Sequence, residues 1–432
     1  MDAETTDKRG TGAPVPLVIL VTAADGGIRT HVTNLVRALD SEAFGPVWVV
    51  GPVGEDWEAE LTLARPGLRL AGRAKPAWMR KLGVGWAAEW AAEVRDAAMA
   101  WDLAAKGGII HAHGAKAAAA VALVLQPAVW AGSTTGNGNH PRRDGGDVGF
   151  VFTAHGFAAG RTGVFLHRLA ALGRPRVVAV SRAVADELKR VAPRSGTPTV
   201  IMNGVDARLF SIPRTVARGV AEPLAASAGG SAGAPYRFGV ACRLAREKGL
   251  DVLLEAAALL SPVGSAPAGG WEIHIAGEGP EGPALEQRAR ELALAGRVFF
   301  SGRVGDMPAF YGRLDALVLP SRREGLSMAV EEAMAAGLPV VASRVGGVPE
   351  LVEEACCGVL TEPGSAQALA GAMDGLLSGK VDGRALGAAG QAFARENLSV
   401  ERMARATEEV YRQALRSGQS QAELIRPDGV GV

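Results

Sequence analysis

Short apolar runs alternate with helical patterns along most of this 432-residue chain. The first run, 16–22 (PLVILVT), is rich in branched residues and is typical of a strand buried on both faces. A turn containing Gly26 and Gly27 follows, and then apolar residues at helical spacing. Similar strand-like runs recur at 47–50, 108–114, 150–156, 177–181 and 199–205. Because repeated strand and helix alternation is typical of a doubly wound parallel sheet, the pattern predicts an α/β fold.

The strand-like runs fall into two series, which predicts two domains. The second series consists of 238–241, 271–277, 297–302, 316–320 and 339–343. Since 432 residues exceed what one hydrophobic core usually supports, we expect two Rossmann-like domains, over 1–212 and 236–400. The segment 213–235 is rich in Ala, Gly, Pro and Ser and is expected to be a linker or flexible insertion. A periodic helix at about 401–418 is expected to pack back on the first domain.

Charge and cysteine content exclude several classes of protein. Lys and Arg number 46 against 45 Asp and Glu, a net charge of +1, so nucleic-acid binding is not expected. The three cysteines, Cys242, Cys356 and Cys357, lack the spacing of a disulfide framework or a metal site, which fits a reducing compartment. The first residues lack an apolar signal core, and no apolar run is long enough to span a bilayer. We therefore expect a cytoplasmic protein.

The segment 321–352 carries the most chemistry. Glu324 and Glu332 are eight residues apart, which on a continuous helix separates them by about 12 Å, too far for the two carboxylates of a glycosidase. Carboxylates can instead accept hydrogen bonds from sugar or ribose hydroxyls. The residues that open the following helix, Gly325, Leu326 and Ser327, offer backbone N–H groups to an anionic phosphate. Taken alone, the segment is explained more simply by a solvated carboxylate beside an amphipathic helix.

This segment resembles the retaining nucleotide-sugar glycosyltransferases of family four. The resemblance rests on E-G-L-S-x4-E-A-M-A-A-G-L-P-V-V-A-S, followed by G-G-V-P-E, and covers nearly the whole chain. It implies the GT-B fold, in which two Rossmann-like domains face each other across a cleft. It also implies a nucleoside diphosphate sugar as substrate, UDP- or GDP-linked, and no cofactor. By the same resemblance, Glu324 holds hydroxyls of the transferred sugar and Glu332 holds the ribose.

Two loops are expected to hold the diphosphate. Arg243 and Lys248 lie between a strand and a helix, at the edge where α/β sheets bind ligands, and this context favours a diphosphate site over surface charges in a loop. The resemblance gives both cations a role on the diphosphate, but Cys242 stands where the family usually has Gly. The turn at Gly26 and Gly27 can approach a diphosphate closely, and it matches the family's first-domain loop G-G-I-x-x-H-V.

Histidines and one further carboxylate complete the candidates. His155 ends a strand, where structural histidines are common, but the resemblance places it at the histidine that reaches the transferred sugar. His111 and His113 have the spacing of a metal pair, yet no third ligand is evident, and structural or acceptor-side roles are preferred. His31 is expected to be a buried structural residue. For Glu278, nucleotide contact and turn formation stay open. The sequence has no Asp-x-Asp, so we expect no metal site.

These observations predict a retaining glycosyltransferase that moves a hexose-type sugar from a nucleotide donor to a hydroxyl acceptor. Two alternatives stay open: a nucleotide-sugar epimerase of the same fold, and an inactive sugar-nucleotide binding protein. The acceptor, whether lipid, glycan or small molecule, is not determined. A basic group at 73–81 is a candidate contact for the acceptor or for the inner membrane surface, where peripheral association is one expectation.

Overall fold

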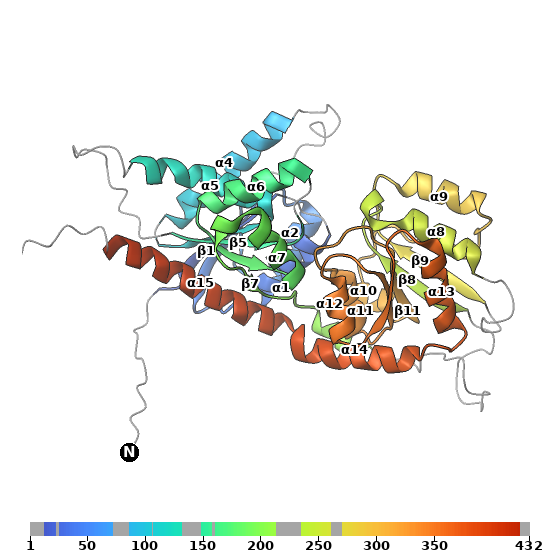
Figure 1. Cartoon of the computed structure of the whole chain (residues 1–432). Helices are drawn as coiled ribbons and strands as arrows, with labels where there is room; N and C mark the ends of the chain where they lie inside the picture. Colours follow the sequence, from blue (N-terminus) through green and yellow to red (C-terminus); the bar gives the residue numbers. More distant parts are fainter. Residues whose placement is uncertain are drawn as a thin grey trace, which may run out of the picture.

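The computed structural model describes residues 13–22, 26–71, 86–105, 107–131, 148–157, 160–212, 235–260 and 270–423. The basic group at 73–81 and nearly all of the expected linker at 213–235 lie outside these ranges. Two α/β units lie side by side, each built on its own parallel sheet (Figure 1). The α/β class and the two doubly wound sheets expected from the sequence are confirmed.

The first unit is a seven-stranded parallel sheet in the order β3-β2-β1-β4-β5-β6-β7. Its strands are β1 (Val15–Val21), β2 (Phe44–Val50), β3 (Arg69–Ala71), β4 (Ile109–His113), β5 (Gly149–Ala154), β6 (Arg176–Ala179) and β7 (Thr199–Val200). Its helices are α1 (Gly27–Ala38), α2 (Glu55–Ala64), α4 (Trp86–Ala104), α5 (Ala115–Ala131), α6 (Gly160–Leu172) and α7 (Arg182–Val191). The strand order reverses at β1, which places a ligand-binding crevice beyond the carboxyl ends of β1 and β4.

The second unit is a six-stranded parallel sheet in the order β10-β9-β8-β11-β12-β13. Its strands are β8 (Tyr236–Ala241), β9 (Trp271–Ala276), β10 (Val298–Phe300), β11 (Ala316–Leu319), β12 (Val340–Ser343) and β13 (Gly358–Thr361). Its helices are α8 (Leu250–Leu259), α9 (Gly282–Glu291), α10 (Met307–Tyr311), α11 (Met328–Ala335), α12 (Val348–Glu354), α13 (Ala366–Leu377) and α14 (Gly383–Asn397). Here the order reverses at β8, so the loops after β8 and β11 flank the second crevice.

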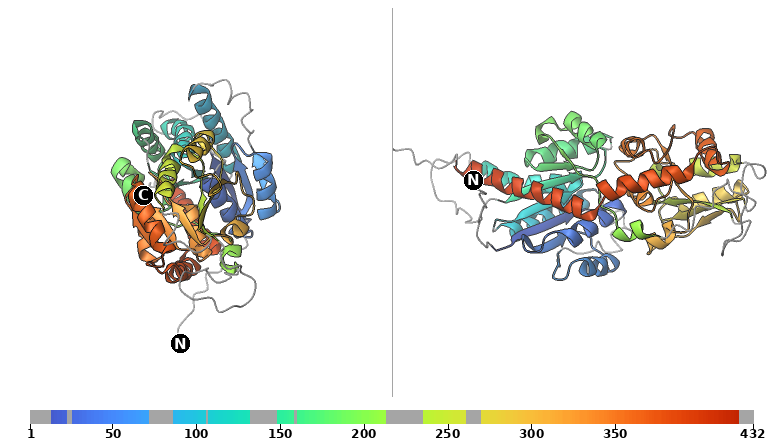
Figure 2. Two further views of the ribbon diagram at one scale, coloured as in Figure 1. Left: turned by 90° about the vertical axis from the view of Figure 1, so that its right-hand side faces the viewer. Right: turned by 90° about the horizontal axis from the view of Figure 1, so that it is seen from below.

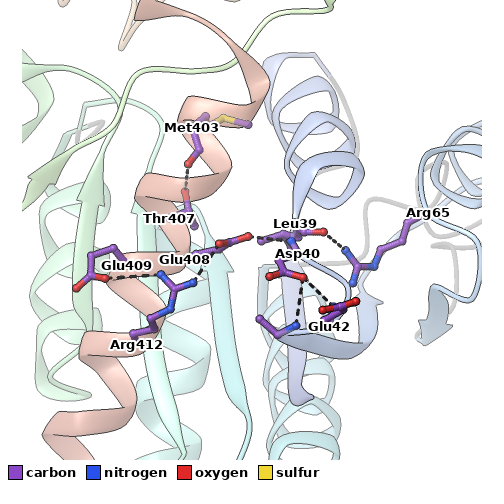
Figure 3. A network of polar contacts seen from close by, with 10 residues as sticks. Leu39, Asp40, Glu42, Arg65, Met403, Thr407, Glu408, Glu409 and Arg412 are labelled. Carbon is purple, nitrogen blue, oxygen red and sulfur yellow. Dashed lines mark hydrogen bonds and ion pairs between the residues drawn. The ribbon is translucent and has the colours of Figure 1, made fainter. Parts of the chain in front are cut away.

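The last helix, α15 (Val400–Glu423), crosses back to the first unit. It follows α14 along one side of the molecule and lies against the first sheet (Figures 1 and 2). Its Tyr411 is fully buried, and its hydroxyl lies 2.7 Å from Nδ1 of His111 on β4. Glu408 accepts a hydrogen bond of 2.8 Å from the backbone N–H of Asp40, beyond the end of α1 (Figure 3). Helix α15, from the carboxyl-terminal part of the chain, therefore covers part of the first sheet.

Residues beyond the carboxyl ends of the two sheets contact each other across an interface. Ser181, which caps α7, donates a hydrogen bond of 3.2 Å to the carbonyl of Gly325. Arg182 forms ion pairs with Glu350, at 3.1 Å, and with Glu354 on α12. These bonds hold the start of α7 in the first unit against the second unit. Within the ranges given above, no helix is both long and apolar enough to cross a membrane.

Candidate functional site

On the second unit, the site is centred on an ion pair between Lys248 and Glu324. The Lys248 ammonium donates to Oε1 of Glu324 over 2.7 Å, and the Ser321 hydroxyl donates to the same oxygen over 2.7 Å. The Glu324 side chain is only 7% exposed, whereas that of Lys248 is 23% exposed. The sequence assigned these two residues to different groups of one substrate, and the structure brings them into direct contact.

A glycine sets the position of Lys248. Gly249, the next residue, has a φ of +65°, and a Cβ there would lie 2.1 Å from the carbonyl oxygen of Pro320. The loop after β8 can therefore approach the end of β11 only with glycine at this position. Arg243, the other expected cation, lies on the same loop and is exposed. Both cations consequently stand at the carboxyl edge of the second sheet.

Glu332 faces a tyrosine that the sequence did not indicate. The hydroxyl of Tyr311, on α10, donates a hydrogen bond of 2.8 Å to Oε2 of Glu332 on α11. Burial raises the pKa of Glu332 to about 7, against the opposing effect of this hydrogen bond. The bond holds the carboxyl in one orientation before any ligand arrives. The helix around Tyr311 spans only five residues, too short for apolar periodicity to reveal which side chain faces Glu332.

The start of α11 lies against the first unit. Gly325, Leu326 and Ser327 lead into this helix, and Ser327 forms no side-chain cap. Opposite lies the expected glycine turn: Gly26 has a φ of +63°, and a Cβ on Gly27 would lie 3.2 Å from Cγ of Met328. The structure thus places the two segments that are expected to face the phosphates next to each other, one from each unit.

Glu278 makes the contacts of a turn residue. Its backbone carbonyl accepts a hydrogen bond of 2.9 Å from the N–H of Leu244, and its Oε1 accepts one of 3.3 Å from the N–H of Arg303. The side chain is exposed at the end of β9. Of the two roles left open by the sequence, turn formation is the one that these contacts describe.

A buried polar chain crosses the interface, which the sequence also did not indicate. Asn203 donates from Nδ2 to Oε2 of Glu331 over 2.8 Å, and its Oδ1 lies 2.9 Å from Nδ1 of His31. Glu331 lies on α11 of the second unit and is fully buried. Burial raises the pKa of Glu331 to about 8, although the bonds from Asn203 oppose the shift. Glu331 falls at an unspecified position of the E-G-L-S-x4-E motif, so the family resemblance implies no role for it.

The pKa of Glu331 predicts a loss of stability between about pH 5 and pH 8. A carboxyl with an ordinary pKa of 4.5 and a folded-state pKa of about 8 binds its proton more tightly in the folded protein. The contribution of this carboxyl to the free energy of unfolding is therefore fully present below pH 4.5. It declines as the pH rises toward 8, by up to about 1.4 kcal/mol per pH unit. Urea unfolding from pH 5 to pH 8 should show a flatter decline in Glu331→Gln. The exposed Glu401→Gln should keep the wild-type slope, and equal slopes in all three proteins would contradict the prediction.

Four histidines gather beneath the interface. His111 and His113 lie on β4, His155 follows β5, and His31 lies on α1. The ring centroids of His111 and His113 are 4.1 Å apart, and those of His31 and His155 are 4.7 Å apart. Nδ1 of His113 lies 3.0 Å from Nε2 of His155. Burial lowers the pKa of every one of the four, to about 4 for His31 and about 3 for His111.

The surroundings of His113 correct one expectation. No third ligand beside the His111 and His113 pair is evident in the sequence, but His31 and His155 both lie next to His113 in the structure. Parallel pairing of β4 with both β1 and β5 produces this arrangement, because it aligns the loops after all three strands. The expectation that His31 is buried is confirmed, since its residue exposure is 3%.

Two family models match the chain, one on each unit. The model described as Glycosyltransferase Family 4 matches residues 25–209, and that described as Glycosyl transferases group 1 matches residues 235–379. The first segment contains the histidines, and the second contains Lys248, Glu324 and Glu332. Both halves of the site therefore lie in matched segments.

Curated relatives match parts of the chain. It is 31% identical over 230 residues to the lipopolysaccharide core biosynthesis mannosyltransferase LpsB of Rhizobium meliloti (strain 1021), covering 50% of this chain and 61% of that protein. It is 34% identical over 171 residues to a GDP-mannose-dependent alpha-(1-6)-phosphatidylinositol monomannoside mannosyltransferase of Mycobacterium tuberculosis (strain CDC 1551 / Oshkosh), covering 36% and 43%. The matches span less than two thirds of these relatives.

Solved structures share the fold over nearly the whole chain. Sucrose-phosphate synthase (tll1590) from Thermosynechococcus elongatus aligns with a TM-score of 0.69 at 19% identity, covering 93% of this chain and 100% of that one. Anabaena Alr3699/HepE in complex with UDP-glucose aligns with a TM-score of 0.66 at 21% identity, covering 94% and 99%. These similarities confirm the expected arrangement of two facing Rossmann-like domains.

Proposed function

This chain belongs to the family-4-like glycosyltransferases of the GT-B fold, and we propose that it transfers a hexose-type sugar from a nucleoside diphosphate to a hydroxyl acceptor. The observation that carries this proposal is the Lys248–Glu324 ion pair at the carboxyl edge of the donor-side sheet. There an ammonium can meet a diphosphate, and a carboxylate can accept hydrogen bonds from sugar hydroxyls. Arg243, on the same loop, adds a second cation.

The reaction breaks the bond between the anomeric carbon and the diphosphate oxygen and forms one to the acceptor oxygen. Lys248 and Arg243 stabilise the negative charge that grows on the departing diphosphate, a role that requires no metal. Glu324 orients the sugar, Glu332 takes the ribose, and His155 reaches the sugar from the first domain. We infer retention at the anomeric carbon from the family resemblance. The leaving phosphate oxygen then accepts the proton of the acceptor hydroxyl on the same face of the sugar.

The relatives suggest the class of acceptor. The names of two matched proteins refer to lipopolysaccharide core and to phosphatidylinositol monomannoside. We therefore propose a glycolipid or growing glycan as the acceptor, used by a cytoplasmic enzyme at the inner membrane surface. The first domain, which holds the histidines, forms the acceptor side.

A donor panel tests the proposal. UDP-glucose, UDP-galactose, GDP-mannose and ADP-glucose are compared by thermal stabilisation of the protein and by release of the nucleoside diphosphate. One nucleotide series should stabilise the wild-type protein, and Glu324→Gln should slow its turnover while leaving nucleotide binding within a few fold. Failure of every donor to bind would contradict the proposal. Conversion of the donor sugar without an acceptor would instead identify an epimerase.

Removing the Tyr311 hydroxyl is expected to weaken donor binding. Without it, the carboxyl of Glu332 loses a hydrogen bond of 2.8 Å that holds it in place. A bond to a charged group contributes about 1.5 kcal/mol or more, so above pH 7, where Glu332 is ionised, Tyr311→Phe should raise the donor KM by about tenfold with a smaller effect on kcat. The control is Tyr236→Phe. Tyr236 lies in the same domain, away from Glu332, and its hydroxyl donates to the carbonyl oxygen of Asp315 over 3.5 Å. An unchanged donor KM in Tyr311→Phe would refute this role.

A further inference from the structure

Three imidazoles from three different loops converge beneath the proposed sugar site. One ring nitrogen from each of His31, His113 and His155 lies within 4.8 Å of the other two. His113 is fully buried, His31 nearly so, and His155 is half-buried at the end of β5. The proposed transfer reaction uses only His155 of the three. It gives no role to His31 and His113, which lie beside His155.

The hydrogen bonding of His113 is incomplete. Its Nε2 is buried and has no hydrogen-bond partner among the residues that the structure describes. One imidazole gives a single nitrogen to one metal ion, so the His113 nitrogen that could bind zinc beside His155 is Nδ1, and Nε2 is not a ligand. Its Nδ1 lies 3.0 Å from Nε2 of His155. One zinc ion, with two Zn–N bonds of about 2.0–2.1 Å, could bind both nitrogens at that separation.

The partners of His31 leave one of its nitrogens unprotonated. Because the Asn203 amide nitrogen donates to Glu331, its oxygen faces His31 and accepts the proton of Nδ1. Nε2 of the neutral ring therefore carries a lone pair. A histidine that binds a metal typically donates its other N–H to an oxygen of this kind, which fixes the ring and its tautomer. The chain from Glu331 through Asn203 has that geometry.

The type of ligand also suits zinc. Neutral imidazoles are the nitrogen ligands that zinc prefers, and three of them with one open position is a known zinc arrangement.

We propose that His31, His113 and His155 form a three-histidine Zn²⁺ site with a fourth position for water or a sugar hydroxyl. Tetrahedral zinc places its nitrogens about 3.4 Å apart, so side-chain rotations must adjust three nitrogens that lie within 4.8 Å of one another. A further consequence rests on the proposed function. Zinc would hold the imidazole of His155 that is assigned to the sugar, so the filled site would inhibit transfer. This zinc is separate from the diphosphate, whose charge is met by Arg243 and Lys248.

The test measures zinc binding without any nucleotide sugar. The full chain is treated with a chelator and titrated with ZnCl₂ by calorimetry, and the bound metal is counted by elemental analysis. We expect one zinc per chain, with affinity reduced by about ten- to a hundredfold or more in His113→Gln. The matched control is His274→Gln, on β9 of the other domain, which should bind as the wild type does. Circular dichroism verifies that both variants fold.

A second measurement needs no variant. In the ¹⁵N NMR spectrum of wild-type histidine side chains, zinc should shift ring nitrogens of three residues and leave the rings of His167 and His274 unchanged. Absence of stoichiometric binding, or equal binding by wild type and a folded His113→Gln, would overturn the proposal. Zinc binding by a protein that uses no donor would refute the proposed function alone. Zinc binding without inhibition would remove the sugar role of His155 and leave the metal site standing.

Discussion

Lys248→Ala is expected to lower kcat for sugar transfer by about 10²- to 10³-fold, or about 2.7–4 kcal/mol of transition-state stabilisation. The alanine removes the ammonium that meets the departing diphosphate. It also leaves the carboxylate of Glu324, whose side chain is 7% exposed, without the cation 2.7 Å away. The measurement is steady-state transfer with the donor identified by the panel.

Two variants control for the effect of Lys248→Ala. Lys189→Ala removes an exposed lysine whose ion pair with Asp186 lies on the surface of α7, and it should change transfer little. Lys248→Arg keeps the positive charge and should recover part of the lost rate. If Lys248→Ala folds normally and retains more than a tenth of wild-type kcat, the ion pair is not part of the catalytic machinery.

Gly325→Ala is expected to reduce transfer by about a hundredfold while leaving both domains folded. A Cβ on Gly325 would lie 2.2 Å from the carbonyl oxygen of His155 and 2.7 Å from Cα of Gly156, both in the first domain. These atoms belong to the backbone, so they cannot rotate away. The two domains must therefore separate locally, which moves His155 away from Glu324, and a displacement of about 1 Å is enough for such a loss.

The control for this effect is a glycine of the same domain with space around it. A Cβ on Gly371, within α13, would meet nothing within 4 Å. Gly371→Ala should keep full activity and gain about 0.5–1 kcal/mol of stability, because alanine favours a helix. Gly325→Ala should bind nucleotide within a few fold of wild type, since Arg243, Lys248 and Glu332 all lie on the second domain and keep their places. Wild-type kcat in Gly325→Ala would show that transfer does not need this contact.

Much of the architecture could be predicted because it depends on local pattern. Strands such as 16–22 are continuous apolar runs, and the loop between β8 and α8 is marked by a strand, two cations and a glycine. The segment around Glu324 carried enough sequence detail to identify the family and the expected donor site. Each of these signals is contained within a few dozen consecutive residues.

The rest of the site depends on contacts between segments that are far apart in the sequence. Asn203 lies 172 residues from His31 and 128 from Glu331, so neither neighbour shows in the sequence. The histidines meet because the order of the strands places β1 beside β4 and β4 beside β5. Tyr311 reaches Glu332 from another short helix. Sheet order and domain contact decide which of these side chains meet, and apolar periodicity carries information about neither.

The return of α15 to the first sheet has a consequence for how the chain folds during synthesis. Met403 and Tyr411 on this helix are buried in the same apolar cluster as Leu17 and Val151 of the first sheet. While the ribosome is still making the second domain, this part of the amino-terminal sheet has no cover. The nascent first domain must therefore wait for almost the entire chain before its core is closed. Chaperones that bind exposed apolar strands would meet it during that interval, and release should coincide with the emergence of the final helix.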